Sequence, residues 1–98
     1  MNLVSQTDSF AERYEHCELH EQEWIDKMRR QLAENLDVGK PLHYDWFREK
    51  KLKGKRLYFI INRQTQKVLF VAFSDKKEQQ ATISHVFSQR DIYLSLVR

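Results

Sequence analysis

The chain has 98 residues, of which 17 are Lys or Arg and 14 are Asp or Glu, so its formal net charge is +3. This length suits one domain with one modest core, and we expect a single domain over residues 1–98. The lone cysteine excludes an internal disulfide framework. No apolar run reaches the ~18 residues of a membrane span, so we expect a cytoplasmic protein without a membrane partner.

The first part of the chain predicts a helical hairpin, because residues 8–38 contain neither Gly nor Pro. Ser9 and Glu12 have the spacing of a capping box, which predicts that the first helix begins there. Apolar side chains recur at helical spacing on both sides of a polar stretch at 18–22, which we interpret as the break between two helices. Gly39 is the expected C-cap of the second helix.

Three strands are predicted next, over residues 46–52, 56–62 and 67–74. The second and third are almost continuously apolar, which is typical of strands that are covered on both faces. The connections between the three strands are short, so we expect them to form an antiparallel meander.

The end of the chain predicts a helix that begins at Ser74 or Asp75 and ends at about Phe87. Apolar residues then alternate over 92–97, which predicts a closing strand, and Leu3–Val4 predicts a short edge strand. The expected fold class is therefore α+β. A helical hairpin near the N-terminus packs on a small, mainly antiparallel sheet of three to five strands, and a helix lies near the C-terminus.

Charge is divided unevenly along the chain. Residues 1–39 hold four Lys or Arg and nine Asp or Glu, a net of −5, whereas residues 40–98 hold thirteen and five, a net of +8. The densest part is Arg48–Arg56, REKKLKGKR, in which six of nine residues are basic. Apolar strand sequence flanks it, so it predicts positive charge mounted on a sheet and a polyanion as partner. The alternative is a generic soluble surface.

Strand alternation places Arg48 and Lys50 on one face of the first strand and Glu49 and Lys51 on the other. We expect Arg56, at the start of the next strand, to lie beside Arg48 or Lys50 across the hairpin. Three cations on one face repel one another unless a phosphate relieves the repulsion, so they predict a phosphate site. A register shift of one residue would bring Lys51 to that site instead of Lys50. The alternative is a Lys-rich strand that blocks edge pairing.

A second basic pair, Lys76–Lys77, follows the third strand, where cations oppose the dipole of the predicted helix. Free N–H groups at a helix start also suit an anion. The alternative is two solvated lysines. Glu12, His16 and His20 lie at helical spacing, but such a set is far more often a solvated helix face than a metal site. We therefore predict no metal site and no cofactor.

These segments together are similar to a known family. A helical hairpin followed by GKPL, FREKKLKGKRLYFII, KVLFVAFSDKKEQQ and a terminal helix resembles the RelE/ParE toxin superfamily of type II toxin–antitoxin systems. The resemblance covers roughly residues 8–87. Its most specific parts are the basic strand followed by an Arg-aromatic strand start, and the F-x-x-K-K-x-Q exit from the third strand. The latter is similar to the HigB-like branch.

The resemblance implies an mRNA endoribonuclease that acts in the ribosomal decoding site. There the ribose 2′-hydroxyl attacks the adjacent phosphate and leaves a cyclic phosphate. By position it implies Lys50 as the base, Arg56 and Arg48 as phosphate clamps, and Lys77 as charge stabiliser or acid. Further residues that could bind RNA phosphate are Lys51, Lys76 and Arg90.

One part of the family's site is missing, because its Tyr on the last helix or tail corresponds to a position near Ile83. The candidates to replace it are His85, Arg90 and Tyr93. The resemblance also implies three partners, which are a cognate antitoxin protein, RNA and the ribosome. Two other functions stay open, namely a ParE-like toxin that inhibits gyrase without catalysis, and a degenerate domain that only binds nucleic acid or a protein partner.

Overall fold

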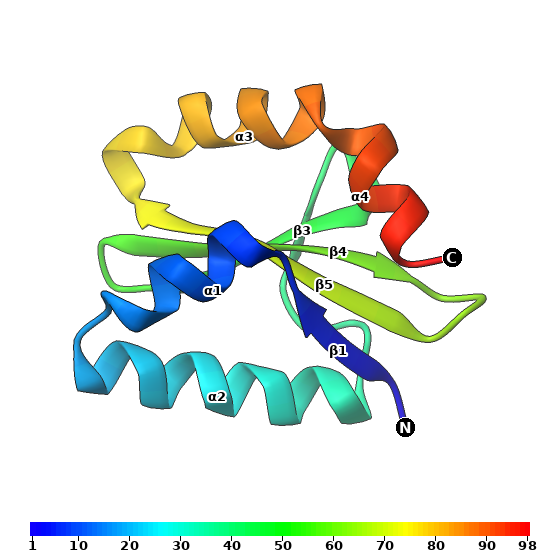
Figure 1. Ribbon diagram of the computed structural model, residues 1–98, viewed down its shortest axis with the longest axis horizontal. Coiled ribbons are helices and arrows are strands. Elements are labelled where there is room, and N and C mark those ends of the chain that lie inside the picture. The colour runs from blue at the N-terminus through cyan, green and yellow to red at the C-terminus, as the bar shows by residue number, and fades with distance from the viewer.

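The computed structural model describes all residues, 1–98, and shows a five-stranded sheet with helices on both faces (Figure 1). The strand order is β1-β5-β4-β3-β2. Helices α1 and α2 cover one face, and α3 and α4 cover the other. The elements are β1 (Leu3–Gln6), α1 (Asp8–Glu15), α2 (Leu19–Glu34), β2 (Lys40–Leu42), β3 (Tyr44–Leu52), β4 (Lys55–Asn62), β5 (Lys67–Asp75), the 3-10 turn η1 (Lys76–Glu78), α3 (Gln79–Ser88) and α4 (Arg90–Leu96).

The predicted α+β fold class and the β3–β4–β5 meander are confirmed. β3 pairs with β4, and β4 with β5, both antiparallel. The predicted edge strand at Leu3–Val4 exists as β1, which precedes the helical hairpin and pairs with β5 in parallel, Leu3 opposite Lys67. At the other edge β2 pairs antiparallel with β3. The sheet therefore joins the first strand of the chain to the last.

The first helix of the hairpin has a different N-cap from the one predicted, whereas the predicted break within 18–22 matches the start of α2 at Leu19. Thr7, not Ser9, is the N-cap of α1, and its hydroxyl accepts a hydrogen bond from the Phe10 N–H at 3.1 Å. A capping box does occur, but at the start of α2, between Glu18 and Glu21. Since Ser, Thr and carboxylate side chains all cap N-termini, the correct one is decided by where the chain leaves β1.

Gly39 does not cap α2, which ends at Glu34 with Asn35 as its C-cap. Gly39 lies further on, in the loop before β2, with φ +88°. A Cβ atom there would lie 2.8 Å from the Phe59 ring and 2.9 Å from the Glu49 carbonyl. Glycine is therefore required because this loop lies directly against the sheet.

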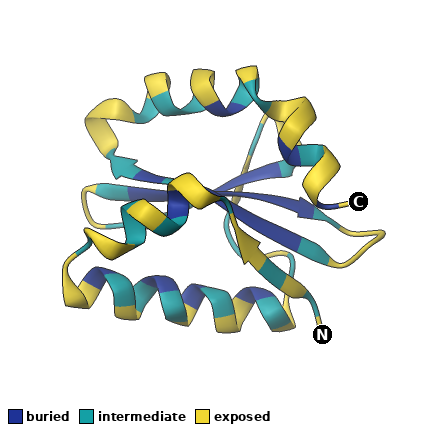
Figure 2. Ribbon diagram, in the orientation of Figure 1, coloured by how far each residue is buried: buried dark blue, intermediate teal, exposed yellow.

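Two apolar clusters fill the space on the two faces of the sheet, and Figure 2 shows the central strands β4 and β5 between them as the most buried part, whereas the edge strand β1 is largely exposed. The cluster under α1 and α2 contains Phe10, Ile25, Met28, Leu32, Leu57, Phe59, Ile61, Val68, Phe70 and Phe73. The cluster under α3 and α4 contains Phe47, Tyr58, Ile60, Leu69, Val71, Val86, Tyr93 and Val97. Successive residues of β4 alternate between the clusters, which is why its sequence is apolar throughout.

The closing strand predicted over 92–97 is wrong, because Arg90–Leu96 is the helix α4. Tyr93 and Val97 are buried four residues apart, while Ile92 and Leu96 are exposed, also four residues apart. A short apolar segment satisfies a period of 2 and a period of 3.6 equally well, so the alternation was not decisive. α3 also begins later than expected, after the turn η1. No helix of the protein combines the length and the apolar character that a membrane crossing requires.

Candidate active site

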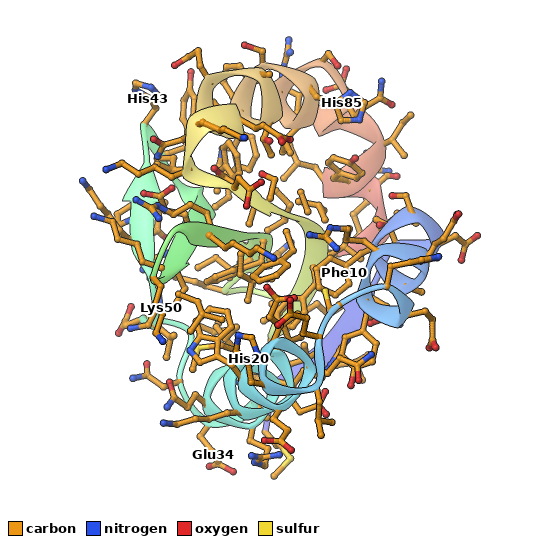
Figure 3. All side chains as sticks on the ribbon, turned by 90° about the vertical axis from the view of Figure 1, so that its left-hand side faces the viewer. Phe10, His20, Glu34, His43, Lys50 and His85 are labelled. Carbon is orange, nitrogen blue, oxygen red and sulfur yellow. The ribbon has the colours of Figure 1, made fainter.

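The register of the β3–β4 hairpin divides the basic segment Arg48–Arg56 between the two faces of the sheet. Lys51 lies opposite Arg56, and Lys50 lies opposite Leu57. Directly opposed residues of an antiparallel pair share a face. Leu57 belongs to the core under α1 and α2, so Lys50 is on that side, as Figure 3 also shows. The prediction that Arg56 shares a face with Arg48 and Lys50 is therefore wrong, and Lys51 is its neighbour.

Arg48 is held by groups of the protein itself. Its side chain is buried, and its guanidinium donates to the Asp45 carbonyl at 3.0 Å and to the Gly39 carbonyl at 3.2 Å. It also forms an ion pair with the Asp45 carboxylate at 2.5 Å. Hydrogen bonds from Arg63 and from Arg48 hold the pKa of Asp45 well below its usual range. The geometry thus gives Arg48 a structural position, away from Arg56.

Lys55 lies between the predicted strands 46–52 and 56–62, but in the structure it is part of a strand. It begins β4 and forms an ion pair with the buried Glu21 of α2. Its ammonium lies 5.6 Å from the centre of the Phe73 ring. Burial raises the pKa of Glu21, but hydrogen bonds from Lys55 and from the Glu18 N–H outweigh it, so the net shift is downward. This contact fastens the hairpin to α2.

A different set of polar side chains meets on the α3 face. Glu49 and Lys51 come from β3, Arg56 and Tyr58 from β4, and Ser74 from β5. Glu49 lies opposite Tyr58, and Arg56 lies between Lys51 and Ser74 across the sheet. Glu49 is 3% exposed, Arg56 5% and Tyr58 0%. Three buried polar side chains at adjacent positions are unusual in the middle of an apolar sheet.

Arg56 is a buried cation without a counterion. Its Nη1 donates to the carbonyls of Lys53 at 3.3 Å and of Lys55 at 3.1 Å, and its Nε has no hydrogen-bond partner. It takes part in none of the six ion pairs of the protein. A buried charge is costly unless it is paired. An anion at this position would offset the cost of burying the charge and would accept a hydrogen bond from the Arg56 Nε–H.

The Tyr58 hydroxyl also has no hydrogen-bond partner. Burial, and then the charge of Glu49, raise its pKa to about 12. The hydroxyl therefore keeps its proton near neutral pH and can donate a hydrogen bond on the same face as Glu49 and Arg56. Tyr58 was not predicted as a site residue, because it lies inside the apolar run of β4. The signal that could have found it is its spacing of two from Arg56, which puts both on one face.

Glu49 was placed on this face by alternation but was not recognised as a candidate. Its carboxylate accepts a hydrogen bond from Gln79 at 3.0 Å and forms no ion pair. Gln79 is the first residue of α3, so this bond ties the helix start to β3. A lone acid within a basic segment was the signal in the sequence. A carboxylate on the same face as a guanidinium and a phenol can act as a proton acceptor.

Lys76 and Lys77 lie at the rim of this face. Both are exposed, in the turn η1. The Lys76 N–H donates to the Gly54 carbonyl at 2.7 Å, which brings this turn against the β3–β4 hairpin. A hollow of about 580 Å³ is lined there by Gly54, Asp75, Lys76, Lys77 and Gln79. The structure thus brings Lys51, Arg56 and Lys77 to the α3 side of the sheet. Arg48 and Lys50 lie on the opposite side, under α1 and α2.

The candidates to replace the missing Tyr lie at the far end of α3 and on α4. Ile83 packs against the apolar cluster under α3 and α4. His85 is exposed on α3, the upper helix of Figure 3. Arg90 is exposed, and its guanidinium lies over the Phe87 ring. Tyr93 is buried in the apolar cluster under α3 and α4. None of these is a neighbour of Arg56 in the sheet. No three His, Cys, Asp or Glu side chains gather closely enough to hold a metal ion.

One comparison with solved structures matches this architecture. A double mutant of the E. coli toxin RelE, in complex with a peptide of the antitoxin RelBc, superposes with a TM-score of 0.69 over 91% of this chain and 93% of the RelE chain. The two sequences are 14% identical. No protein-family model matches the sequence. No curated protein matches it either.

The chain has the RelE fold. The resemblance to the RelE/ParE superfamily, drawn from the sequence, is thereby confirmed at the level of the fold. The likeness extends over nearly the whole of both chains, so no large part of the RelE architecture is missing here. The HigB-like character of the exit from β5 stays a prediction.

Proposed function

We propose that this protein is the toxin of a toxin–antitoxin system and cleaves mRNA by attack of a ribose 2′-hydroxyl on the adjacent phosphate. The observation that carries the proposal is the buried Arg56, which has a free Nε and no carboxylate partner on a RelE-like sheet. An RNA phosphate supplies the missing anion. The basic half of the chain, with its net charge of +8, supplies attraction over longer distances.

The chemistry requires three functions near one phosphate. A base takes the proton from the 2′-hydroxyl, and the resulting oxygen attacks phosphorus. The bond from phosphorus to the 5′-oxygen breaks, and that oxygen is protonated, which leaves a 2′,3′-cyclic phosphate and a 5′-hydroxyl. Positive charge stabilises the phosphorane-like transition state between these steps.

The α3 face offers residues for these functions. Arg56 binds the phosphate oxygens, with Lys51 directly opposite on β3 as a second cation. Glu49 is the base in this proposal, because it is a carboxylate with no ion-pair partner on the same face. Lys77 at the rim stabilises charge or protonates the leaving oxygen. The Tyr58 hydroxyl is a further hydrogen-bond donor to the phosphate.

This assignment differs from the one that the resemblance implies. The resemblance implies Lys50 as the base. Lys50 instead lies on the face of α1 and α2, at the edge of a hollow of about 490 Å³ with Lys40 and Gly39. Its partner across the hairpin, Leu57, lies on the opposite face of the sheet from Arg56. Lys76 and Arg90 remain proposals for contact with more distant phosphates.

The proposal includes an antitoxin as partner, and translating ribosomes as the place of action. The RelE chain of similar fold was solved with an antitoxin peptide. An antitoxin segment that covers the α3 face would have to be acidic where it meets Lys51, Arg56 and Lys77.

The decisive experiment compares wild type, Arg56→Ala and Arg48→Ala in growing cells and in a translation reaction with purified components. We expect wild type to arrest growth and to cut mRNA only when it is translated, with 2′,3′-cyclic phosphate ends. Arg56→Ala should remain folded but cleave about 10²- to 10³-fold more slowly. Arg48→Ala is the matched control, since it removes an arginine from the other face.

A folded wild-type protein that neither arrests growth nor cuts translated mRNA would contradict the proposal. DNA supercoiling by purified gyrase is measured with the same preparations. Inhibition of gyrase that survives Arg56→Ala, without RNA cleavage, would indicate the ParE-like alternative.

A further inference from the structure

A second feature of the α3 face lies away from the buried arginine. Three aromatic rings pack against one another at the other end of β3 and α3, and the Tyr44 and Phe87 ring centres are 5.5 Å apart at 32°. The Tyr44 and Trp46 ring centres are 5.4 Å apart at 21°, and those of Trp46 and Phe87 are 6.0 Å apart at 14°. The Arg90 guanidinium lies over the Phe87 ring at 5.4 Å. We call these four residues the aromatic shelf.

The outer end of the aromatic shelf is open. Tyr44 is 47% exposed, whereas Trp46 and Phe87 are half-buried beneath it. A hollow of about 380 Å³ is lined by Tyr44, Trp46, Phe87, Arg90, Asp91 and Leu94. Packing of the core accounts for the two inner rings, but it does not require a tyrosine with half of its surface in water.

The charges around this hollow indicate which part of a nucleic acid fits. Arg90 and Asp91 are adjacent, so the hollow is neutral, and its remaining lining is apolar or aromatic. A phosphate would be repelled by the Asp91 carboxylate. A nucleobase has two flat apolar faces and an edge of donors and acceptors, which suits an aromatic ring, a guanidinium and a carboxylate.

The position of the aromatic shelf relates it to the proposed catalytic residues. Trp46 and Lys51 are on the same strand, five residues and so about 16 Å apart. Lys77 and Phe87 lie at opposite ends of the η1–α3 segment, about 15 Å apart at 1.5 Å per residue. A single strand of RNA that runs along β3 and α3 covers this distance with roughly two to five nucleotides.

We propose that the aromatic shelf binds one unpaired RNA base, a few nucleotides from the phosphate held by Arg56. The base stacks on the exposed face of Tyr44, and Arg90 and Asp91 contact its polar edge. This inference rests on the proposed function, since it takes single-stranded RNA as the ligand. It adds a contact to one base of the RNA to the contacts that the proposed function makes with phosphates.

The test is binding of a labelled single-stranded RNA of about eight nucleotides, 2′-O-methylated throughout so that it cannot be cleaved. We expect Tyr44→Ala to weaken binding at least about fivefold, and Tyr44→Phe to bind within about twofold of wild type. The salt dependence of binding should be the same in all three, because stacking releases no counterions. Ile92→Ala is the matched control, since Ile92 is a similarly exposed apolar residue of α4 outside the hollow.

An abasic scan of the same oligonucleotide sharpens the test. Removing the base at one position should weaken binding to wild type and leave binding to Tyr44→Ala unchanged, because the two changes remove the same contact. Equal affinities of wild type and Tyr44→Ala would overturn the inference. So would a Tyr44→Ala protein that loses binding to a protein partner while its RNA affinity is unchanged.

The readout separates this inference from the proposed function. Binding with a base-dependent loss at Tyr44, but without cleavage of translated mRNA, would refute the nuclease proposal and support the aromatic shelf. Cleavage of translated mRNA together with RNA binding that is unchanged by Tyr44→Ala would support the nuclease proposal and refute the aromatic shelf. Wild type that binds no oligonucleotide would overturn the aromatic shelf directly.

Discussion

The two faces of the sheet treat their positive charges differently. On the α1 and α2 face, Arg48 is bound to Asp45 and to loop carbonyls, and Lys55 is paired with Glu21. On the α3 face, Arg56 is equally buried but has no carboxylate partner, and the Tyr58 hydroxyl nearby is also unpartnered. One short basic segment therefore supplies both cations that stabilise the fold and cations that are available to a ligand.

This contrast shows that burial alone does not identify a functional arginine. Arg48 and Arg56 are 6% and 5% exposed, so exposure cannot distinguish them. Their hydrogen-bond partners do, because a paired buried charge is part of the structure whereas an unpaired one needs an anion.

The largest effect is expected for Glu49→Gln. If Glu49 is the base, its removal should lower the cleavage rate about 10²- to 10⁴-fold. Gln keeps the size and the polar contact near Gln79, so RNA binding and the melting temperature should stay close to wild type. Single-turnover cleavage rates over a range of pH check this. A rate that is unchanged, with an unchanged pH profile, would exclude Glu49 as the base.

The next effect compares Arg56→Ala with Arg48→Ala. Arg56→Ala should lower cleavage about 10²- to 10³-fold, as for loss of one transition-state donor. It should cost less stability than Arg48→Ala, because removing a buried charge that forms no ion pair offsets the loss of its hydrogen bonds to the Lys53 and Lys55 carbonyls. Arg48→Ala should instead cost about 2 kcal/mol in stability, since carbonyl acceptors lose their donor. Urea unfolding and cleavage are measured on both. Similar stability losses in the two variants would break the comparison between the faces.

A smaller effect is expected from Lys55→Ala, which leaves Glu21 buried without its partner. The loss should be about 2 kcal/mol, less than for a fully buried pair because Lys55 is partly exposed. The lowered pKa of Glu21 means that its stabilising share is present above its unfolded pKa of about 4.3 and is lost as pH falls through the folded value. Urea unfolding at about pH 7 and about pH 3 should therefore show a smaller acid-induced loss in Glu21→Gln than in wild type. An equal acid-induced loss would count against this ion pair.

The smallest effect separates two adjacent lysines. Lys51→Ala should weaken RNA binding by about tenfold or less and lower the slope of log K against log salt by about 0.7, the value for one phosphate contact on a single strand. Lys50→Ala should leave both nearly unchanged, because Lys50 is on the other face. The two variants have the same net charge, so they are matched controls for each other. The opposite result would mean that RNA lies on the α2 side.

Much of the fold could be predicted from local sequence. The continuous apolar runs of β4 and β5 and the short turns between them indicated the meander correctly. The element over 90–96 could not be assigned in this way, because its seven residues fit both a strand and a helix. Trp46 also differs from simple alternation, since it packs toward Phe87 rather than on the Arg48 face.

The site could be predicted only in part. The segment Arg48–Arg56 was the correct region, but the partner of Arg56 depends on the length of one turn. With Lys53–Gly54 as a two-residue turn, Leu52 pairs with Lys55 and Lys51 with Arg56. A turn longer by one residue would have shifted the register of β3 against β4, so that every residue would face a different partner. Glu49 and Tyr58 were missed for another reason, because their importance follows from which atoms lack partners, and that is a property of the assembled structure.

The pairing of β1 with β5 also has a consequence for how the protein is made. Leu3 is opposite Lys67, so the sheet cannot be completed until most of the chain has left the ribosome. The meander from β3 to β5 contains only near-neighbour pairings and can form earlier. We therefore expect the N-terminal strand to be the last to join the sheet during synthesis, so that a nascent chain completes its sheet only after β5 has emerged from the ribosome.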